Sequence, residues 1–338
     1  MQRFAQKKVR RIKGLLRPKG IILMYHRIAD VDNDPWQLCV KPELFKEQLE
    51  VIKRSNCVMS LQELSETVIS NKSRKKAIAL TFDDGYRDNF YEARKWLELY
   101  QIPATFFIAC GYTGNHTEFW WDELERIFLT PGQLPESLEL EQKHLRGNLG
   151  SDALLTEEGY QKYKNWSTRK PPPSKRHELY LAIWKFINAC SHERQLETIQ
   201  DVALWAKSQL GTRKNYLPMT KEELIQCGKS DFIEIGAHTC NHPNLSTLSK
   251  ADQKREIFEG KEVLETWTQK EVKTISYPHG KYNQDTLKLT KEAGFDFAYT
   301  TQDHLANGEQ SRYTLPRFQV KNWNGKEFER KLKKWLEY

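Results

Sequence analysis

The sequence predicts an α/β protein in which about seven parallel strands form a barrel, complete or distorted, with one largely helical insertion. Three observations lead to this prediction. Short apolar runs of strand length alternate with segments of helical spacing, an order typical of parallel strands joined by crossover helices. The alternation stops over residues 112–217, where helical patterns and prolines replace it. Acidic residues and histidines directly follow several predicted strands, which is where parallel sheets build their sites.

The predicted strands and helices account for most of the chain outside the insertion. Strands are expected over residues 21–25, 78–82, 104–109, 232–237, 273–277, 297–300 and 315–320. Helices are expected over residues 44–53, 89–100, 249–267 and 283–294, after the capping residues Ser60 and Thr220, and over 321–338. The barrel is thus expected to cover residues 21–320, interrupted by the insertion, and to follow a basic leader over residues 1–20.

The net charge of +8 lies entirely in this leader. Residues 1–20 contain eight Lys or Arg residues and no acid, so the remaining chain is neutral overall. This charge balance, and the lack of a known nucleic-acid-binding motif, argue against a nucleic-acid partner. Apolar residues of the leader are spaced loosely as in an amphipathic helix. A peripheral contact of residues 1–20 with an anionic membrane is one interpretation, and a solvated tail is the other.

The cysteines and the apolar runs indicate the cellular compartment. The six cysteines are scattered without a Cys-x-x-Cys pair, a pattern typical of free thiols in a reducing compartment. No apolar run approaches the ~20 residues of a membrane span, and residues 21–25 are too short for the core of a signal peptide. We therefore expect a cytoplasmic protein, with peripheral contact at the inner membrane face as a further option.

Two adjacent carboxylates, Asp83 and Asp84, end the strand predicted over residues 78–82. Gly85 follows them and permits a backbone conformation that a side chain would disfavour. Two carboxylates at a buried edge repel each other, and they are best tolerated when they share a cation or when one has a proton to move. The alternative is an ordinary Asp-Gly turn that caps the next helix.

Two histidines, His238 and His242, follow the strand predicted over residues 232–237. Their spacing would place both imidazoles on one face of a helical turn, within reach of one cation. Such a pair alone is weak evidence, since exposed histidines often have this spacing. In a parallel α/β fold, however, the pair shares a sheet edge with Asp83 and Asp84. Two imidazoles and one carboxylate are typical of a catalytic site for zinc or a similar ion.

These two segments resemble a known family. Residues 81–86 (Thr-Phe-Asp-Asp-Gly-Tyr) and 238–242 (His-Thr-Cys-Asn-His) are similar to the first two motifs of the polysaccharide deacetylases, the NodB-homology group of metal-dependent carbohydrate esterases. The resemblance extends over residues 21–111 and 216–320. It implies a distorted (β/α) barrel, often with seven strands, that removes acetyl groups from N-acetylated sugars.

The resemblance implies a role for each matching residue. Asp83 matches the general base that acts on a metal-bound water, and Asp84, His238 and His242 match the three metal ligands. Thr239 stands where a hydroxyl group braces the ligand loop. The cation is expected to be Zn, with Co, Ni or Mn as alternatives.

The later motifs depart from the family pattern. Ser276 stands where many members carry an arginine. His26, at the end of the first predicted strand, resembles a permuted variant of the family in which such a histidine protonates the departing amine. On this interpretation Arg317 orients Asp83 in place of the missing arginine. The alternatives are a strand-end histidine with satisfied hydrogen bonds and a purely structural ion pair.

Further residues are expected to face the substrate. The Tyr86 backbone N–H would donate to the oxyanion, and the loop after residue 276 would contact the sugar. The predicted oxyanion and substrate set comprises Tyr86, Tyr277, Pro278 and His279. Trp120 and Trp121 either form a wall on which sugars stack or anchor the inserted helices.

The sequence therefore predicts a metal-dependent hydrolase that removes N-acetyl groups from amino sugars of a polysaccharide or glycan precursor and releases acetate. Two alternatives stay open. One is an O-acetyl esterase acting on a decorated polysaccharide, which the motifs do not distinguish. The other is a non-catalytic glycan- or membrane-binding protein on the same fold, against which the complete ligand set argues.

Overall fold

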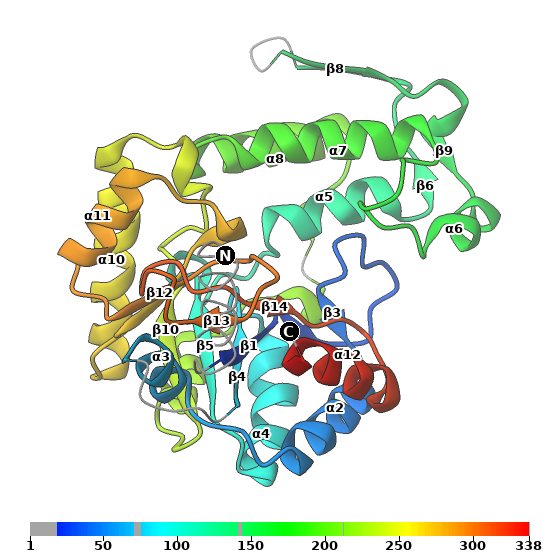
Figure 1. The fold of residues 1–338 in the computed structure, drawn as a ribbon. Coiled ribbons are helices and arrows are strands. Elements are labelled where there is room, and N and C mark those ends of the chain that lie inside the picture. The colour runs from blue at the N-terminus through cyan, green and yellow to red at the C-terminus, as the bar shows by residue number, and fades with distance from the viewer. Residues whose placement is uncertain (1–18, 71–75, 141–143, 212, 338) are drawn as a thin grey trace, which may run out of the picture.

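The computed structural model describes residues 19–70, 76–140, 144–211 and 213–337 (Figure 1). Within these residues, one eight-stranded sheet has the order β12-β11-β10-β5-β4-β1-β13, with β14 also beside β1. All neighbours are parallel except β1 and β13 (Ala306–Asn307). The parallel strands are β1 (Lys19–Tyr25), β4 (Ala77–Phe82), β5 (Ala104–Ile108), β10 (Ile233–Ala237), β11 (Thr274–Ser276), β12 (Phe297–Tyr299) and β14 (Phe318–Gln319).

The two ends of this sheet are joined by one segment of chain. Tyr299 in β12 forms a parallel bridge with Leu315, and the same segment continues into β14, where Phe318 pairs with Leu23 of β1. The strand predicted over residues 315–320 is therefore divided between this bridge and the short β14. The resulting distorted barrel of seven parallel strands confirms the predicted fold class. Its central strands are buried throughout, as expected of parallel strands covered by helices.

Helices surround the barrel close to their predicted positions. Three begin where the sequence predicts: the side chains of Thr220, Ser249 and Asn283 each accept a hydrogen bond from a backbone N–H of the first turn. The helix predicted over residues 89–100 begins instead with a π-helical turn, Asn89–Ala93. The barrel helices are α2 (Pro42–Arg54), α3 (Leu61–Ser70), α4 (Arg94–Tyr100), α9 (Lys221–Gly228), α10 (Lys250–Thr268), α11 (Gln284–Glu292) and α12 (Gly325–Glu337).

The insertion forms a layer over one end of the barrel (Figure 1). Its helices are α5 (Trp120–Leu129), α6 (Glu157–Tyr163), α7 (Lys175–Asn188) and α8 (His192–Trp205). Apolar side chains of α5, α7 and α8 form a hydrophobic cluster separate from the barrel core. Two short antiparallel pairs, which the sequence did not predict, join β6 (Gly132–Gln133) to β9 (Leu154–Leu155) and β7 (Ser137–Leu140) to β8 (Leu145–Asn148).

The leader expected over residues 1–20 lies almost wholly outside the described residues. Only Lys19 and Gly20 are described, and both belong to β1, so the membrane contact of this segment stays a prediction. Among the described helices, none is long and apolar enough to cross a bilayer. The six cysteines are free thiols, as the sequence predicts.

Candidate metal centre and active site

Asp83 and Asp84 follow β4 directly and enter a tight turn. The φ angles of Asp84 and Gly85 are 74° and 87°, in the left-handed region that residues with a side chain rarely adopt. A Cβ atom at Gly85 would also stand 3.2 Å from Cδ1 of Ile108. The turn buries both carboxylates, which are 2% and 4% exposed. Strained, buried acids at a strand end are typical of functional sites.

Asp84, His238 and His242 bring three candidate ligand atoms together. The Nε2 atoms of His238 and His242 lie 3.4 Å and 3.3 Å from Oδ1 of Asp84. One ligand atom from each of the three residues lies within 4.8 Å of the other two, and all three side chains are buried. Two imidazoles and a carboxylate at this separation fit a divalent cation of the zinc type and leave a coordination position open.

Hydrogen bonds orient the two imidazoles. The backbone oxygen of Ser276 can only accept, so Nδ1 of His238, 2.7 Å away, carries the proton. In the neutral ring this leaves the Nε2 lone pair free for a cation. The backbone N–H of His242 donates to Oγ1 of Thr239 at 3.0 Å, the bracing that the resemblance implies. Thr239 and His242 have φ angles of 64° and 55°. The histidines therefore converge through an irregular turn and not, as predicted, on one face of a helical turn.

Arg317 forms a bidentate ion pair with Asp83. Its Nη1 donates to Oδ1 at 2.7 Å and its Nη2 to Oδ2 at 2.6 Å. Nη2 also donates to Oγ of Ser276 at 2.6 Å, and Nη1 to Oγ1 of Thr81 at 3.0 Å. The guanidinium is fully buried. Ser276, at the position where many family members carry an arginine, also donates from Oγ to Oδ2 of Asp83 at 3.3 Å. It therefore contacts both Asp83 and Arg317, and the arginine comes from another part of the chain.

These contacts decide the charge of the two aspartates. Burial raises the pKa of a carboxyl group, but at Asp83 the charge and hydrogen bonds of Arg317 outweigh burial and lower the pKa below its ordinary value. At Asp84, burial is likewise outweighed, by the close approach of the His238 and His242 imidazoles, and the pKa lies well below its ordinary value. Both groups are therefore carboxylates at neutral pH, one beside an arginine and the other among the candidate ligands.

His26 lies at the same edge because β1 and β4 are adjacent, and contacts from the 81–89 segment hold its backbone. Nδ2 of Asn89 donates to the backbone oxygen of His26 at 2.8 Å. The next residue, Arg27, forms an ion pair with Asp88 at 3.1 Å, and Oδ1 of Asp88 accepts from the backbone N–H of Ile28 at 3.0 Å. The acidic segment thus contributes Asp83 and Asp84 to the site and also fixes the strand end that carries His26.

One cavity of about 560 Å³ collects most of the predicted residues. From the barrel it is lined by His26, Asp83, Asp84, His238, His242 and His279. From the insertion it is lined by Trp121, Thr168, Arg169, Trp184 and Asn188. The insertion therefore forms one wall of the candidate active site.

Two predicted substrate-facing residues, Tyr277 and Pro278, do not reach the cavity. The Tyr277 side chain is fully buried and donates to Oγ1 of Thr290 at 3.2 Å; Pro278 is also buried, and neither lines the cavity. Of the predicted loop, only His279 and the following Lys281 do so. The Tyr86 side chain is directed to the insertion, where its hydroxyl donates to Asp122 at 2.7 Å, and the oxyanion role expected of its backbone N–H stays a prediction. Residues 274–278 are all buried, which the sequence alone did not reveal.

The two tryptophans of α5 have different surroundings. The Trp121 ring lies 4.8 Å from that of His242 and lines the cavity, whereas Trp120 is buried in the cluster of the insertion. Both rings belong to the cluster of the insertion, which supports the anchoring interpretation, and sugar stacking on Trp121 stays a prediction. Trp36 and Trp184, whose ring centroids are 4.2 Å apart, also line the cavity and were missed. They lie on distant segments, and the sequence carried no signal beyond its ten tryptophans.

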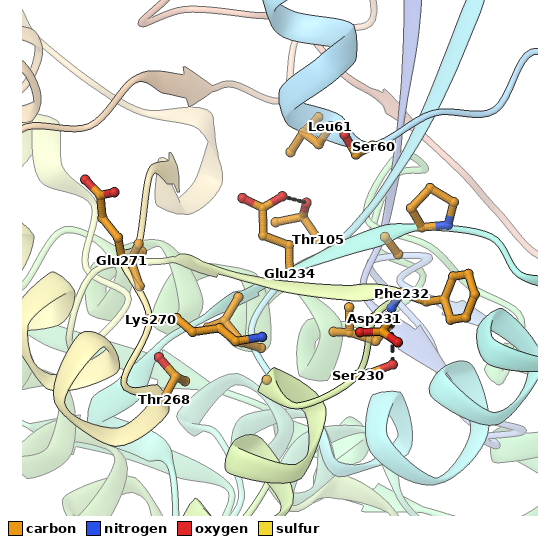
Figure 2. Close-up of a pocket in the computed structure, with 16 residues that line it drawn as sticks. Ser60, Leu61, Thr105, Ser230, Asp231, Phe232, Glu234, Thr268, Lys270 and Glu271 are labelled. Carbon is orange, nitrogen blue, oxygen red and sulfur yellow. Dashed lines mark hydrogen bonds between the residues drawn. The ribbon is translucent and has the colours of Figure 1, made fainter.

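A second cavity, of about 350 Å³, lies at the opposite, amino-terminal ends of β5 and β10 (Figure 2). Its labelled polar groups include Thr105 and Glu234, which bond to each other at 3.4 Å. It contains none of the candidate ligands. Since barrels of parallel strands carry their sites at the carboxyl ends, the cavity with Asp84 is the candidate active site.

The sequence matches a family model. Residues 70–133 and 189–298, together just over half of the chain, match the model described as polysaccharide deacetylase. The matched ranges contain Asp83, Asp84, His238 and His242. They do not contain His26, Arg317 or residues 134–188 of the insertion.

Individual relatives match shorter segments. The poly-beta-1,6-N-acetyl-D-glucosamine N-deacetylase of Staphylococcus aureus is 27% identical over 125 residues, which are 35% of this chain and 42% of that protein. YxkH of Bacillus subtilis is 30% identical over 102 residues, 30% of this chain and 36% of that protein. The matches thus span about two fifths or less of the length of these relatives.

Solved structures resemble the whole chain. The deacetylase PplD of Streptococcus pyogenes in complex with acetate has a TM-score of 0.54 at 21% identity, covering 93% of this chain and 98% of that one. IcaB from Ammonifex degensii has a TM-score of 0.58 at 14% identity, covering 95% and 98%. At these identities the likeness shows a common fold.

Proposed function

The chain belongs to the polysaccharide deacetylase family, and from this premise we propose that it hydrolyses the N-acetyl group of an amino sugar in a glycan and releases acetate. One observation carries the proposal. An ionised, arginine-paired aspartate, Asp83, lies beside the candidate cation site formed by Asp84, His238 and His242, in one cavity with a histidine that can act as the acid. The activity named for the Staphylococcus aureus relative is consistent with it.

The donor set supports a divalent cation, and we propose Zn. Asp84, His238 and His242 would hold it, because tetrahedral sites with two imidazoles and a carboxylate plus one open position are typical of catalytic zinc. When bound, such a cation supplies Lewis-acid polarisation of the acetamide carbonyl and makes an adjacent water more acidic. Co, Ni and Mn can occupy the same nitrogen and oxygen ligands.

Two side chains carry out the two proton transfers of the proposed reaction. Asp83 accepts a proton from the attacking water, and the two N–H groups of Arg317 hold its carboxylate in one orientation. The water oxygen bonds to the acetyl carbon, and the carbon–nitrogen bond breaks. His26 donates a proton to the departing nitrogen, so the sugar leaves as a free amine and the acetyl group as acetate.

The first test measures metal content and acetate together. Purified protein is expected to contain a divalent cation and to release acetate from N-acetylglucosamine oligomers, and a chelator should abolish release until the cation is restored. His238→Ala should lose both the cation, measured by elemental mass spectrometry, and the activity. Faster release from O-acetylated than from N-acetylated oligomers would identify an esterase instead, and a metal-loaded protein inactive on both would contradict catalysis.

His26→Ala tests the acid. Turnover of N-acetylated substrate should fall by roughly 100-fold or more, the scale of general acid catalysis, with the metal content unchanged. The loss should shrink for a substrate with a leaving group that needs no proton, such as an aryl ester of acetic acid. His116→Ala, an exposed histidine outside the cavity, is the matched control. Unchanged turnover in His26→Ala would return His26 to a structural role.

A further inference from the structure

We propose that a groove beside the active-site cavity binds a negatively charged group carried by the same glycan chain whose amino sugar is deacetylated. We name it the basic groove, after its cations Arg169, Lys321, Lys331 and Lys334. The inference rests on the proposed function and specifies its substrate class, an anionic glycan bearing phosphodiester or carboxylate groups.

The basic groove is continuous with the active site. It encloses about 580 Å³, and three residues, Arg169, Asp303 and Gln319, line both it and the cavity that contains Asp83. These residues come from the insertion, from the segment after β12 and from β14, and Nη2 of Arg169 donates to Oε1 of Gln319 at 3.3 Å. A glycan whose amino sugar occupies the cavity can therefore continue along this boundary into the groove.

The charge of the groove is strongly one-sided. Five basic side chains line it, namely Lys19 and the four named cations, and the only carboxylate among its lining residues is that of Asp303. Within the described part of the chain, no ion pair includes Arg169, Lys321, Lys331 or Lys334. Because the chain beyond residue 20 is neutral overall, this excess is local to the groove.

The cations also act on one another. Burial lowers the pKa of Lys321, and the positive charges of Arg169 and Lys331 lower it further. Neighbouring cations repel one another, and an anion that binds between them relieves this repulsion. Lysine and arginine are the side chains that recognise phosphate and carboxylate groups in proteins.

Aromatic rings in the groove favour a sugar chain as the carrier of this anion. Trp323 and Trp335 both line it, with ring centroids 6.1 Å apart, and such rings offer flat apolar faces next to polar edges. Nζ of Lys331 lies 5.2 Å from the Trp323 ring, so charge and aromatic surface are adjacent. A concave groove that opens into the active site suits a bound chain better than it suits contact with a membrane surface.

The test compares N-acetylated oligomers of equal length that are neutral, carry phosphodiesters or carry uronic-acid carboxylates. The groove variant Lys321→Gln/Lys331→Gln/Lys334→Gln is measured beside a control that removes three exposed lysines elsewhere, Lys229→Gln/Lys254→Gln/Lys288→Gln. Both lose the same net charge, and both should keep the wild-type melting temperature and metal content.

We expect the wild type to prefer an anionic oligomer, and the groove variant to lose roughly tenfold in kcat/KM for it. The loss should lie in KM, should disappear at high salt, and should be absent for the neutral oligomer and from the control variant. The phosphodiester and carboxylate arms identify which anion is preferred.

Other results would overturn the inference in distinct ways. Equal losses on neutral and anionic oligomers would assign the groove to packing or to uncharged sugar contacts. Loss of binding to vesicles of anionic lipid, with oligomer kinetics unchanged, would make it a membrane contact. If no oligomer yields acetate, the proposed function fails. Tryptophan fluorescence can then still measure how the three oligomers bind to the wild type and to the groove variant. This comparison decides whether the groove selects anions.

Discussion

Asp83→Asn is expected to lower kcat for deacetylation by roughly 100- to 10,000-fold, the usual contribution of a positioned general base, while the cation stays bound. The carboxamide has almost the same shape as the carboxylate but cannot accept the proton of the attacking water. Because Asp83 is not among the three clustered candidate ligands, elemental mass spectrometry should give the wild-type metal content. Steady-state acetate release and metal content, measured on the same preparation, check both halves of this prediction.

Asp231→Asn is the matched control, since Asp231 is an exposed aspartate at the opposite end of the barrel, in the cavity of Figure 2. It should behave as the wild type. Near-normal turnover in Asp83→Asn would show that another group takes the proton. Loss of the cation together with activity would mean instead that Asp83 contributes to metal binding.

Arg317→Met is expected to destabilise the protein by about 3–5 kcal/mol in the free energy of unfolding at neutral pH and to abolish most activity. Removal of one partner leaves the other as an uncompensated buried charge, which costs about this much. Asp83 is 2% exposed and Arg317 fully buried, so solvent screens the uncompensated charge only weakly. Urea denaturation monitored by fluorescence measures the loss, and acetate release measures the activity.

The pH dependence of that loss has a defined sign. In the wild type the pKa of Asp83 is lowered, so its ionisation stabilises the fold above the unfolded-state value of about 3.9. This contribution disappears as the pH falls through the lowered pKa. In Arg317→Met, burial without the arginine raises that pKa instead. The difference in stability between wild type and variant should therefore be largest near pH 7 and shrink in acid.

Two further variants separate the causes. Arg312→Met, an exposed arginine five residues earlier, should change stability little. In Asp83→Asn/Arg317→Met the buried charges are removed together, so part of the stability should return while activity does not. If Arg317→Met is as stable as the wild type, the ion pair is not the buried, unsolvated pair described above.

The sequence anticipated much of the fold because its signals are local. The strand leading to Asp83 is apolar except for Thr81, and the caps at Thr220, Ser249 and Asn283 depend only on residues within the same turn. Prediction from the sequence failed where the structure depends on contacts between distant segments. The short β14 exists because Phe318 pairs with Leu23 of β1, and a two-residue strand has no periodicity of its own.

The residues of the candidate site also fall into those that local signals predicted and those that depend on distant contacts. Asp84, His238 and His242 could be grouped because each follows a predicted strand and parallel strands end at one edge. Trp36 and Trp184 could not be found, since they line the cavity from a loop and from an inserted helix that no local pattern brings together. Tyr277 was assigned to the substrate side, but its side chain packs in the core.

By itself, then, the sequence determined the alternation of strands and helices, the paired acids and the two histidines, because these follow from apolar periodicity and residue type. Only the tertiary structure decided what each acid contacts. Barrel closure brings Arg317 from near the C-terminus onto Asp83, and an irregular turn brings both histidines onto Asp84. Neighbouring carboxylates of the same type therefore acquire different surroundings, since charge and burial at each oxygen are set by residues more than 150 positions away.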